Sequence, residues 1–121
     1  LCTRSVGLLA REIEASGITT SALALVRGVA VEVRAPRMLY LHWPYGHAMG
    51  EPDNVGQQRA VLRDLLSMAR AAPRAGLLVD LPYRWRRESY PPIDDWTVDS
   101  AAFTAALSAA MEGQRVSTPV S

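Results

Sequence analysis

The chain has 121 residues, of which 49% are hydrophobic and 21% are charged, and its formal net charge is +1. This length and apolar fraction suit one ordinary folded domain and exclude a chain that is disordered throughout. The small net charge attracts neither nucleic acid nor an anionic membrane surface, and the sequence has no apolar run of about 18 residues that would span a bilayer, so neither partner is expected.

The cysteine content limits the redox and metal chemistry of the chain. Its single cysteine, Cys2, excludes an internal disulfide and a thiolate-rich zinc site. The only histidines are His42 and His47, so we expect no metal site. Nothing in the sequence resembles an export signal, and we therefore expect a cytoplasmic protein.

The first third of the chain predicts a helix, a strand and a second helix. Residues 3–16 have the spacing of an amphipathic helix, and Gly17 stands where helices commonly end. The side chains expected to face the core are Val6, Leu9, Ala10 and Ile13. Residues 18–26 predict a buried strand. Residues 27–35 fit either a strand or one helical face; we favour a short helix because a parallel crossover usually contains one.

The middle of the chain predicts two strands around a long helix. Residues 38–43 and 76–81 are the strands. Asn54 and Gln57 have the spacing of a capping box, which predicts a helix over residues 55–72. Its inward side chains are expected to be Val55, Leu62, Leu65, Leu66 and Ala69.

The last helix is expected to begin at a cap formed by Asp99, to run through Met111 and to end at Gly113. Its inward side chains are expected to be Phe103, Ala106, Leu107, Ala110 and Met111. Residues 116–121 have the composition of a flexible tail.

This alternation predicts one three-layer α/β domain over residues 1–115, with a mostly parallel sheet flanked by helices. A βαβ series begins with a strand. We therefore expect the first strand to lie before residue 1, in which case the chain is the carboxyl part of a longer one.

Ligands of parallel sheets bind where the carboxyl ends of the strands meet, and three unusual segments are expected there. Cys2 opens the first helix beside Arg4, where the helix dipole and the guanidinium favour a thiolate. This arrangement fits a redox or nucleophilic thiol. The alternative is that Cys2 is a small buried hydrophobe.

The second segment is the loop over residues 45–52. Gly46 and Gly50 allow the backbone to approach a ligand, and His47 between them fits an acid or base. Alternatively, His47 is a loop histidine that bonds a neighbouring carbonyl. Glu51 would pair with an arginine or polarise His47, whereas His42, inside an apolar strand, is expected to be structural.

The third segment follows the last strand. Asp80 interrupts that strand at its carboxyl end, and Arg84 or Arg86 is the expected partner of its carboxylate. The pair would orient a substrate or clamp the proline-rich loop over residues 82–95, and we favour the clamp.

Residues 7–20, 44–52 and 80–85 together resemble the glycine/sarcosine/betaine reductase selenoprotein B family, to which the D-proline reductase subunit is related. The resemblance extends from about Cys2 to Arg87. It implies a reductase subunit in which a selenocysteine or cysteine attacks an amino acid or its N-methyl derivative and cleaves a C–N bond with electrons from thiols. No selenocysteine and no Cys-x-x-Cys pair is present in this sequence.

The sequence thus predicts a thiol- or selenol-dependent oxidoreductase subunit with Cys2 and His47 as catalytic residues. The expected substrate-binding residues are Arg4, Gly46, Gly50, Glu51, Asp80 and Arg84. No cofactor is evident beyond a thiol electron donor. The expected partners are a small-molecule substrate, a second reductase subunit or a thioredoxin-like donor, and further copies of the chain. The alternative is a non-catalytic subunit or small-molecule-binding module of such a complex.

Overall fold

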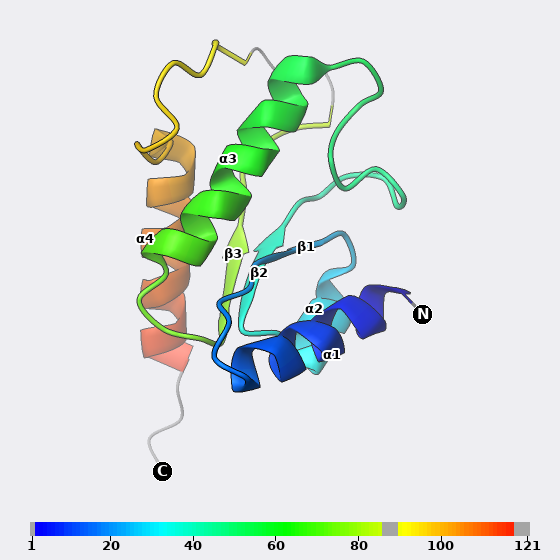
Figure 1. Ribbon diagram of the computed structural model, residues 1–121, viewed down its shortest axis with the longest axis vertical. Helices are drawn as coiled ribbons and strands as arrows, with labels where there is room; N and C mark the ends of the chain where they lie inside the picture. The colour runs from blue at the N-terminus through cyan, green and yellow to red at the C-terminus, as the bar shows by residue number, and fades with distance from the viewer. Residues whose placement is uncertain (1, 86–89, 118–121) are drawn as a thin grey trace.

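The structure is a computed structural model that describes the backbone of residues 2–85 and 90–117 and the side chains of residues 4–85 and 90–113. Its elements follow the order α1 (Cys2–Ala15), β1 (Ala22–Ala24), α2 (Arg27–Val33), β2 (Arg37–Tyr40), α3 (Val55–Ala71), β3 (Leu77–Asp80) and α4 (Ala101–Ser117). The strands form one parallel sheet in the order β1-β2-β3 (Figure 1). The predicted α/β class with a parallel sheet is confirmed.

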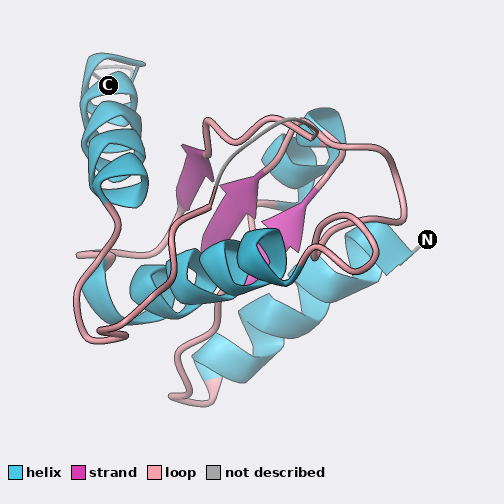
Figure 2. Ribbon diagram, turned by 90° about the horizontal axis from the view of Figure 1, so that it is seen from above, coloured by secondary structure: helices cyan, strands magenta, loops and turns pink. Residues whose placement is uncertain are grey.

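Helices α2 and α3 lie on opposite sides of the sheet, and α4 lies beside β3 (Figure 2). On one face, α1 and α2 cover a small cluster that includes Ala22, Ala24 and Met38. On the other face, α3 and α4 cover a larger cluster that includes Leu39 and Val79. The chain thus crosses from β1 to β2 on one face and from β2 to β3 on the other. Because both crossovers advance in the same direction across the sheet, they have opposite hands.

The strands are shorter than the apolar runs that predicted them. β1 has only 3 residues, because Ile18 is exposed and the chain enters α2 directly after Val26. The helical alternative for residues 27–35 is confirmed by α2, which ends at Arg34 in a left-handed conformation with φ 56°. Arg37 fixes the start of β2 against α1, because its guanidinium forms a largely buried ion pair with Glu14.

The face that α1 turns inward differs from the prediction. Val6, Leu9 and Ile13 are exposed, and only Ala10 of the predicted set is buried. The reason is the close approach of α1 to α2. A Cβ atom at Gly7 would lie 2.3 Å from Cγ1 of Val33, so α1 packs on its small residues and leaves the larger ones outside.

The prediction for α3 is correct only in part. Leu65 packs against the larger cluster and Ala69 is half-buried, but the other three predicted side chains face solvent. Val55, Leu62 and Leu66 are exposed. The buried side chains are Gln57, Ala60, Val61, Asp64, Ser67 and Met68. Half of this buried face is polar, so an apolar stripe could not identify it.

In α4, the predicted inward residues do pack against the larger cluster, and Phe103 is fully buried. Two details of the prediction are wrong. The hydroxyl of Ser100 accepts the N–H of Phe103 at 3.0 Å and so caps the helix in place of Asp99. The helix also continues past Gly113 to Ser117; the rest of the predicted tail, residues 118–121, lies outside the described residues.

We expect Gly7→Ala to lower the free energy of unfolding by about 1–3 kcal/mol, because the added methyl group overlaps Val33 and pushes α1 away from α2. Urea unfolding monitored by circular dichroism measures the change. The control is Gly28→Ala in α2, where a Cβ atom meets nothing within 4 Å. That variant should gain up to about 1 kcal/mol from helix propensity. Equal effects of the two substitutions would contradict the close approach.

Candidate functional site

The candidate site lies at the carboxyl edge of the sheet, where the loops that follow the parallel strands meet. An apolar pocket of about 240 Å³ opens there. Val6 of α1 lines it together with Tyr45, Gly46 and Ala48 of the loop after β2. The other lining residues are Leu23, Ala24, Leu25, Val26, Val29, Ala30 and Met38. The loop that carries Gly46 therefore does face α1, one helical turn beyond Cys2.

His47 lies beside this pocket in a tightly turned loop. Its backbone N–H donates to the carbonyl of Pro44 at 3.2 Å, and its carbonyl accepts the N–H of Gly50 at 3.0 Å. The exposed imidazole contacts the indole of Trp85, with ring centroids 5.0 Å apart. Trp85 also contacts Trp43 at 5.5 Å. The loop after β2 and the segment after β3 thus meet through His47 and Trp85.

Gln57 holds these two segments together from the first turn of α3. Its side chain is fully buried. Its Oε1 accepts the backbone N–H of Glu51 at 2.6 Å, and its Nε2 donates to the carbonyl of Trp85 at 3.1 Å and to the hydroxyl of Tyr90 at 3.2 Å. Asn54 accepts the Gln57 backbone N–H, as predicted. The second bond of a capping box, from the Gln57 side chain back to the backbone of Asn54, is not formed, because that side chain bonds to the two loops.

Gly50 is required by this arrangement. Its φ of +114° is a conformation that other residues rarely adopt, and a Cβ atom there would lie 2.8 Å from Oε1 of Gln57. The glycine therefore makes room for the glutamine. The sequence had suggested that Gly50 makes room for a ligand, but the group that approaches it is a side chain of the same chain.

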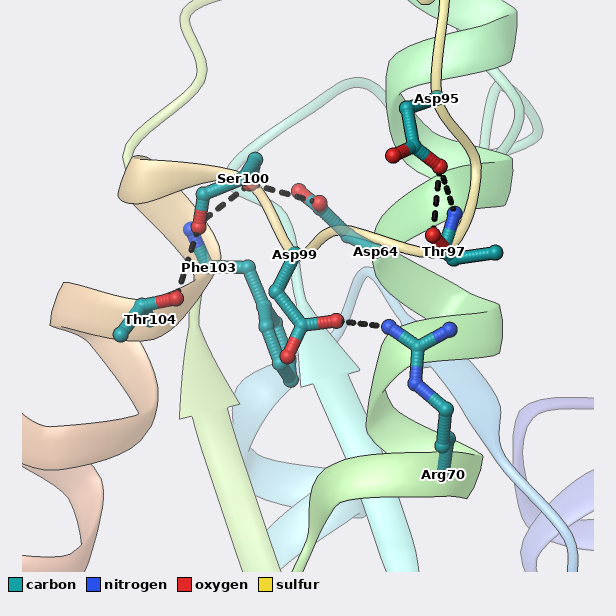
Figure 3. Close-up of polar contacts among 8 residues, drawn as sticks. All are labelled: Asp64, Arg70, Asp95, Thr97, Asp99, Ser100, Phe103 and Thr104. Atoms are coloured by element: carbon teal, nitrogen blue, oxygen red, sulfur yellow. Dashed lines mark hydrogen bonds and ion pairs between the residues drawn. The ribbon is translucent and has the colours of Figure 1, made fainter.

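A second buried polar group supports the segment after β3. Asp64 of α3 is fully buried, and its carboxylate accepts hydrogen bonds from Tyr83 at 2.6 Å and from Ser100 at 2.8 Å. Figure 3 shows the bond to Ser100, and beside it the ion pair between Arg70 and Asp99 that also joins α3 to the start of α4. The network fixes the segment after β3 and the beginning of α4 to one helix.

Burial shifts the acidities within this network. It raises the pKa of Asp64 above its ordinary value, although the hydrogen bonds from Tyr83 and Ser100 act in the opposite direction. Burial, followed by the bond to Asp64, also raises the pKa of the Tyr83 hydroxyl. The Tyr83 hydroxyl therefore keeps its proton at physiological pH and donates it in the hydrogen bond to Asp64.

Two of the predicted substrate-binding residues have partners that the sequence did not suggest. Asp80 pairs with Arg27 at the start of α2, with N–O distances of 3.1 and 3.3 Å, and not with Arg84. The two meet because the beginning of α2 and the end of β3 lie at the same edge of the sheet. Arg4 pairs with Glu32 of α2 at 2.8 Å.

The other predicted residues lie as follows. The carboxylate of Glu51 makes no ion pair with the described residues; the backbone of this residue bonds to Gln57. The carbonyl of Arg84 lies 3.5 Å from Nε2 of Gln57. The side chains of Cys2 and Arg86 lie outside the described residues. His42 is exposed and its Nδ1 lies 3.3 Å from the Tyr40 hydroxyl.

The described residues lack two further features. No group of three His, Cys, Asp or Glu side chains there is arranged to hold a metal ion. No helix within the same ranges is long and apolar enough to cross a membrane.

The fold and the site define a small α/β domain with an apolar pocket at the carboxyl edge of a parallel sheet. The sequence is 37% identical over 84 residues to D-proline reductase subunit gamma of Acetoanaerobium sticklandii. The match covers 69% of this chain and 35% of that protein, so the chain spans about a third of its curated relative. No protein-family model matches the sequence, and no solved structure matches the chain. The comparison relates the chain to a reductase subunit; the narrower resemblance to the selenoprotein B family stays a prediction.

Replacing Tyr83 by Phe tests the buried network. We expect the free energy of unfolding to fall by about 1–3 kcal/mol, because an oxygen of the buried Asp64 carboxylate loses its hydrogen bond. Urea unfolding at neutral pH measures the loss. Tyr40→Phe removes a hydroxyl that bonds to the exposed His42 and should change stability by less than about 0.5 kcal/mol. Equal losses would show that Asp64 does not depend on Tyr83.

The raised pKa of Asp64 predicts how stability varies with pH. The folded protein binds the proton of Asp64 more tightly than the unfolded chain does, so protonation of Asp64 stabilises the fold. This contribution to the free energy of unfolding is complete below the ordinary aspartate pKa of about 4, and it is lost as the pH rises through the folded pKa. Asp64→Asn has no such titration. We therefore expect its free energy of unfolding, relative to wild type, to increase as the pH rises from about 4 towards neutrality. Urea unfolding of both proteins across this range measures the difference. A difference that stays constant or decreases would contradict the assignment.

Proposed function

We propose that this chain belongs to a thiol-dependent reductase subunit and binds a small amine substrate at the carboxyl edge of its sheet. One observation carries the proposal: the loop residues Gly46 and His47 stand between an apolar pocket lined by Val6 of α1 and the indole of Trp85. Similarity to a subunit of D-proline reductase supports the same class of reaction.

The proposed chemistry is the reductive cleavage of a C–N bond. The C–N bond is replaced by a C–H bond and an N–H bond, and a dithiol supplies two electrons and two protons as it becomes a disulfide. In this proposal Cys2 is the thiol that attacks carbon and His47 gives a proton to the departing amine. The sequence contains one cysteine, so the second thiol belongs to a partner subunit, a thioredoxin-like donor or a small dithiol.

The remaining predicted residues take supporting roles. The side chain of Arg4 is half exposed in its ion pair with Glu32, so a substrate carboxylate can compete for the guanidinium. Asp80 is equally exposed beside Arg27. Glu51 and Arg84 are assigned to the rim of the site, next to the backbone groups that Gln57 holds.

The second candidate function is a non-catalytic binding module. The single cysteine favours it, because the chain by itself lacks the thiol pair that the reaction consumes. The two functions differ in one measurement: a reductase oxidises a dithiol when substrate is present, whereas a binding module binds the same substrate without consuming thiol.

The test uses D-proline as the probe and dithiothreitol as the reductant. We expect wild-type chain to consume both together, and His47→Ala to lower that rate by about 10²–10⁴-fold because a proton donor is lost. His42→Ala, which removes an exposed histidine bonded to Tyr40, is the matched control and should retain the wild-type rate. Circular dichroism should show that both variants keep the fold.

The outcomes separate the candidates. If calorimetry detects D-proline binding without thiol oxidation, the non-catalytic module is correct. If His47→Ala matches His42→Ala in rate, the histidine has no chemical role. If D-proline neither binds nor reacts, the proposed substrate class is wrong.

A further inference from the structure

A groove of about 770 Å³ lies next to the apolar pocket of the candidate site and shares Ala30 and Met38 with it. It runs between α2, which covers one face of the sheet, and the second half of α4, which packs against β3. Its floor is apolar and consists of Ala30, Val31, Met38, Leu78, Ala106 and Ala110.

The groove is positively charged at its rim. Among the described residues, three arginines line it, namely Arg27, Arg34 and Arg74, and one acidic residue, Asp80. Asp80 already accepts two hydrogen bonds from Arg27. Arginine beside an apolar floor is the composition of protein interfaces that receive an acidic partner.

The same sequence also contains an acidic region. Residues 88–114 contain five acidic side chains and no basic one, although the net charge of the whole chain is +1. The exposed stretch within this region, residues 94–98, is here called the acidic segment. Asp94 and Asp95 are exposed, as are Trp96 at 39% and Val98 at 57%.

The acidic segment has a defined shape before any partner binds. The carboxylate of Asp95 accepts the N–H of Thr97 at 2.9 Å and its hydroxyl at 2.5 Å, which holds Trp96 at the tip of a turn. A preformed turn loses little conformational entropy on association. Tryptophan is also the side chain that most often dominates an interface.

Within one molecule the acidic segment is kept away from the groove. Asp99 pairs with Arg70, and Ser100 bonds to the buried Asp64, so the residues that directly follow the segment are bound to α3 (Figure 3). α3 packs on the face of the sheet opposite to α1 and α2. None of residues 94–98 lines the groove of its own molecule, so the two complementary surfaces can meet between copies.

We propose that a second copy of this chain docks its acidic segment into the arginine-rimmed groove. Trp96 and Val98 would cover the apolar floor, and Asp94 would face Arg34. The contact joins two different surfaces, so it produces a ring or an open chain of molecules and not a two-fold dimer. This association is independent of the proposed reductase function.

Sedimentation velocity across a range of protein concentrations tests the proposal. Wild-type chain should associate, and raising the salt from about 0.1 M to about 1 M should weaken association, because the Debye length falls from about 10 Å to about 3 Å. Arg34→Glu in the groove and Trp96→Ser in the acidic segment should each weaken association by about tenfold or more. If Trp96→Ser does not fold, Val98→Ser makes the same test.

The controls change the same residue types elsewhere. Arg59→Glu reverses an exposed charge on α3 outside the groove, and Leu66→Ser removes an exposed apolar side chain of the same helix. Both should associate like wild type.

A mixture of the two interface variants gives the sharpest outcome. Arg34→Glu keeps an intact acidic segment and Trp96→Ser keeps an intact groove. The mixture should form a one-to-one complex that does not grow further, at protein concentrations where each variant alone is monomeric. A wild-type chain that is monomeric at every concentration, association unaffected by either variant, or a mixture that stays monomeric would overturn the proposal; in the first case a small organic anion becomes the better occupant of the groove.

Discussion

The buried amide of Gln57 is the interaction on which the carboxyl edge of the sheet depends. One side chain satisfies a backbone donor of the loop after β2 and a backbone acceptor of the segment after β3. Neither segment has regular secondary structure of its own, so each would otherwise leave polar backbone groups without partners near the core. The contact between His47 and Trp85 is a result of this clamp, because it is the clamp that brings their two segments together.

Asp64 has an equivalent role about two helical turns further along α3. At a depth where helices usually present apolar side chains, its carboxylate accepts hydrogen bonds from Tyr83 and Ser100. Polar groups at such depth are costly unless every bond is made, and they therefore define a single arrangement of their partners. The inner surface of α3 thus holds the neighbouring loops in one position through directional hydrogen bonds, which a surface of leucines could not form.

The sequence was sufficient for the order of the elements, the parallel sheet and the inner face of α4, because these depend on local spacing and on apolar runs. It was insufficient for the inner faces of α1 and α3. The exposed Leu9 and Leu66 fit an apolar stripe better than the buried Gly7 and Gln57 do. Both are buried because of partners that are distant in the chain. Val33 lies against Gly7, and the two loops bond to the side chain of Gln57. The spacing of Gln57 from Asn54 was visible, but it predicted a helix cap and gave no sign of the longer-range role. Asp80 was expected to bond within its own loop, and sequence proximity could not show that Arg27 is closer in space.

The alanine-rich cluster beneath α1 and α2 has a consequence for local opening. Five of its six buried residues are alanines, so each contributes far less buried apolar area than the leucines and Phe103 of the opposite face. Layers held by little buried area separate at a lower free energy than the rest of a domain. α1 and α2 also form two walls of the apolar pocket, through Val6 and Val29. The pocket is therefore bounded in part by a layer with little buried apolar area, and local opening of that layer would widen the pocket while the sheet and α3 stay in place.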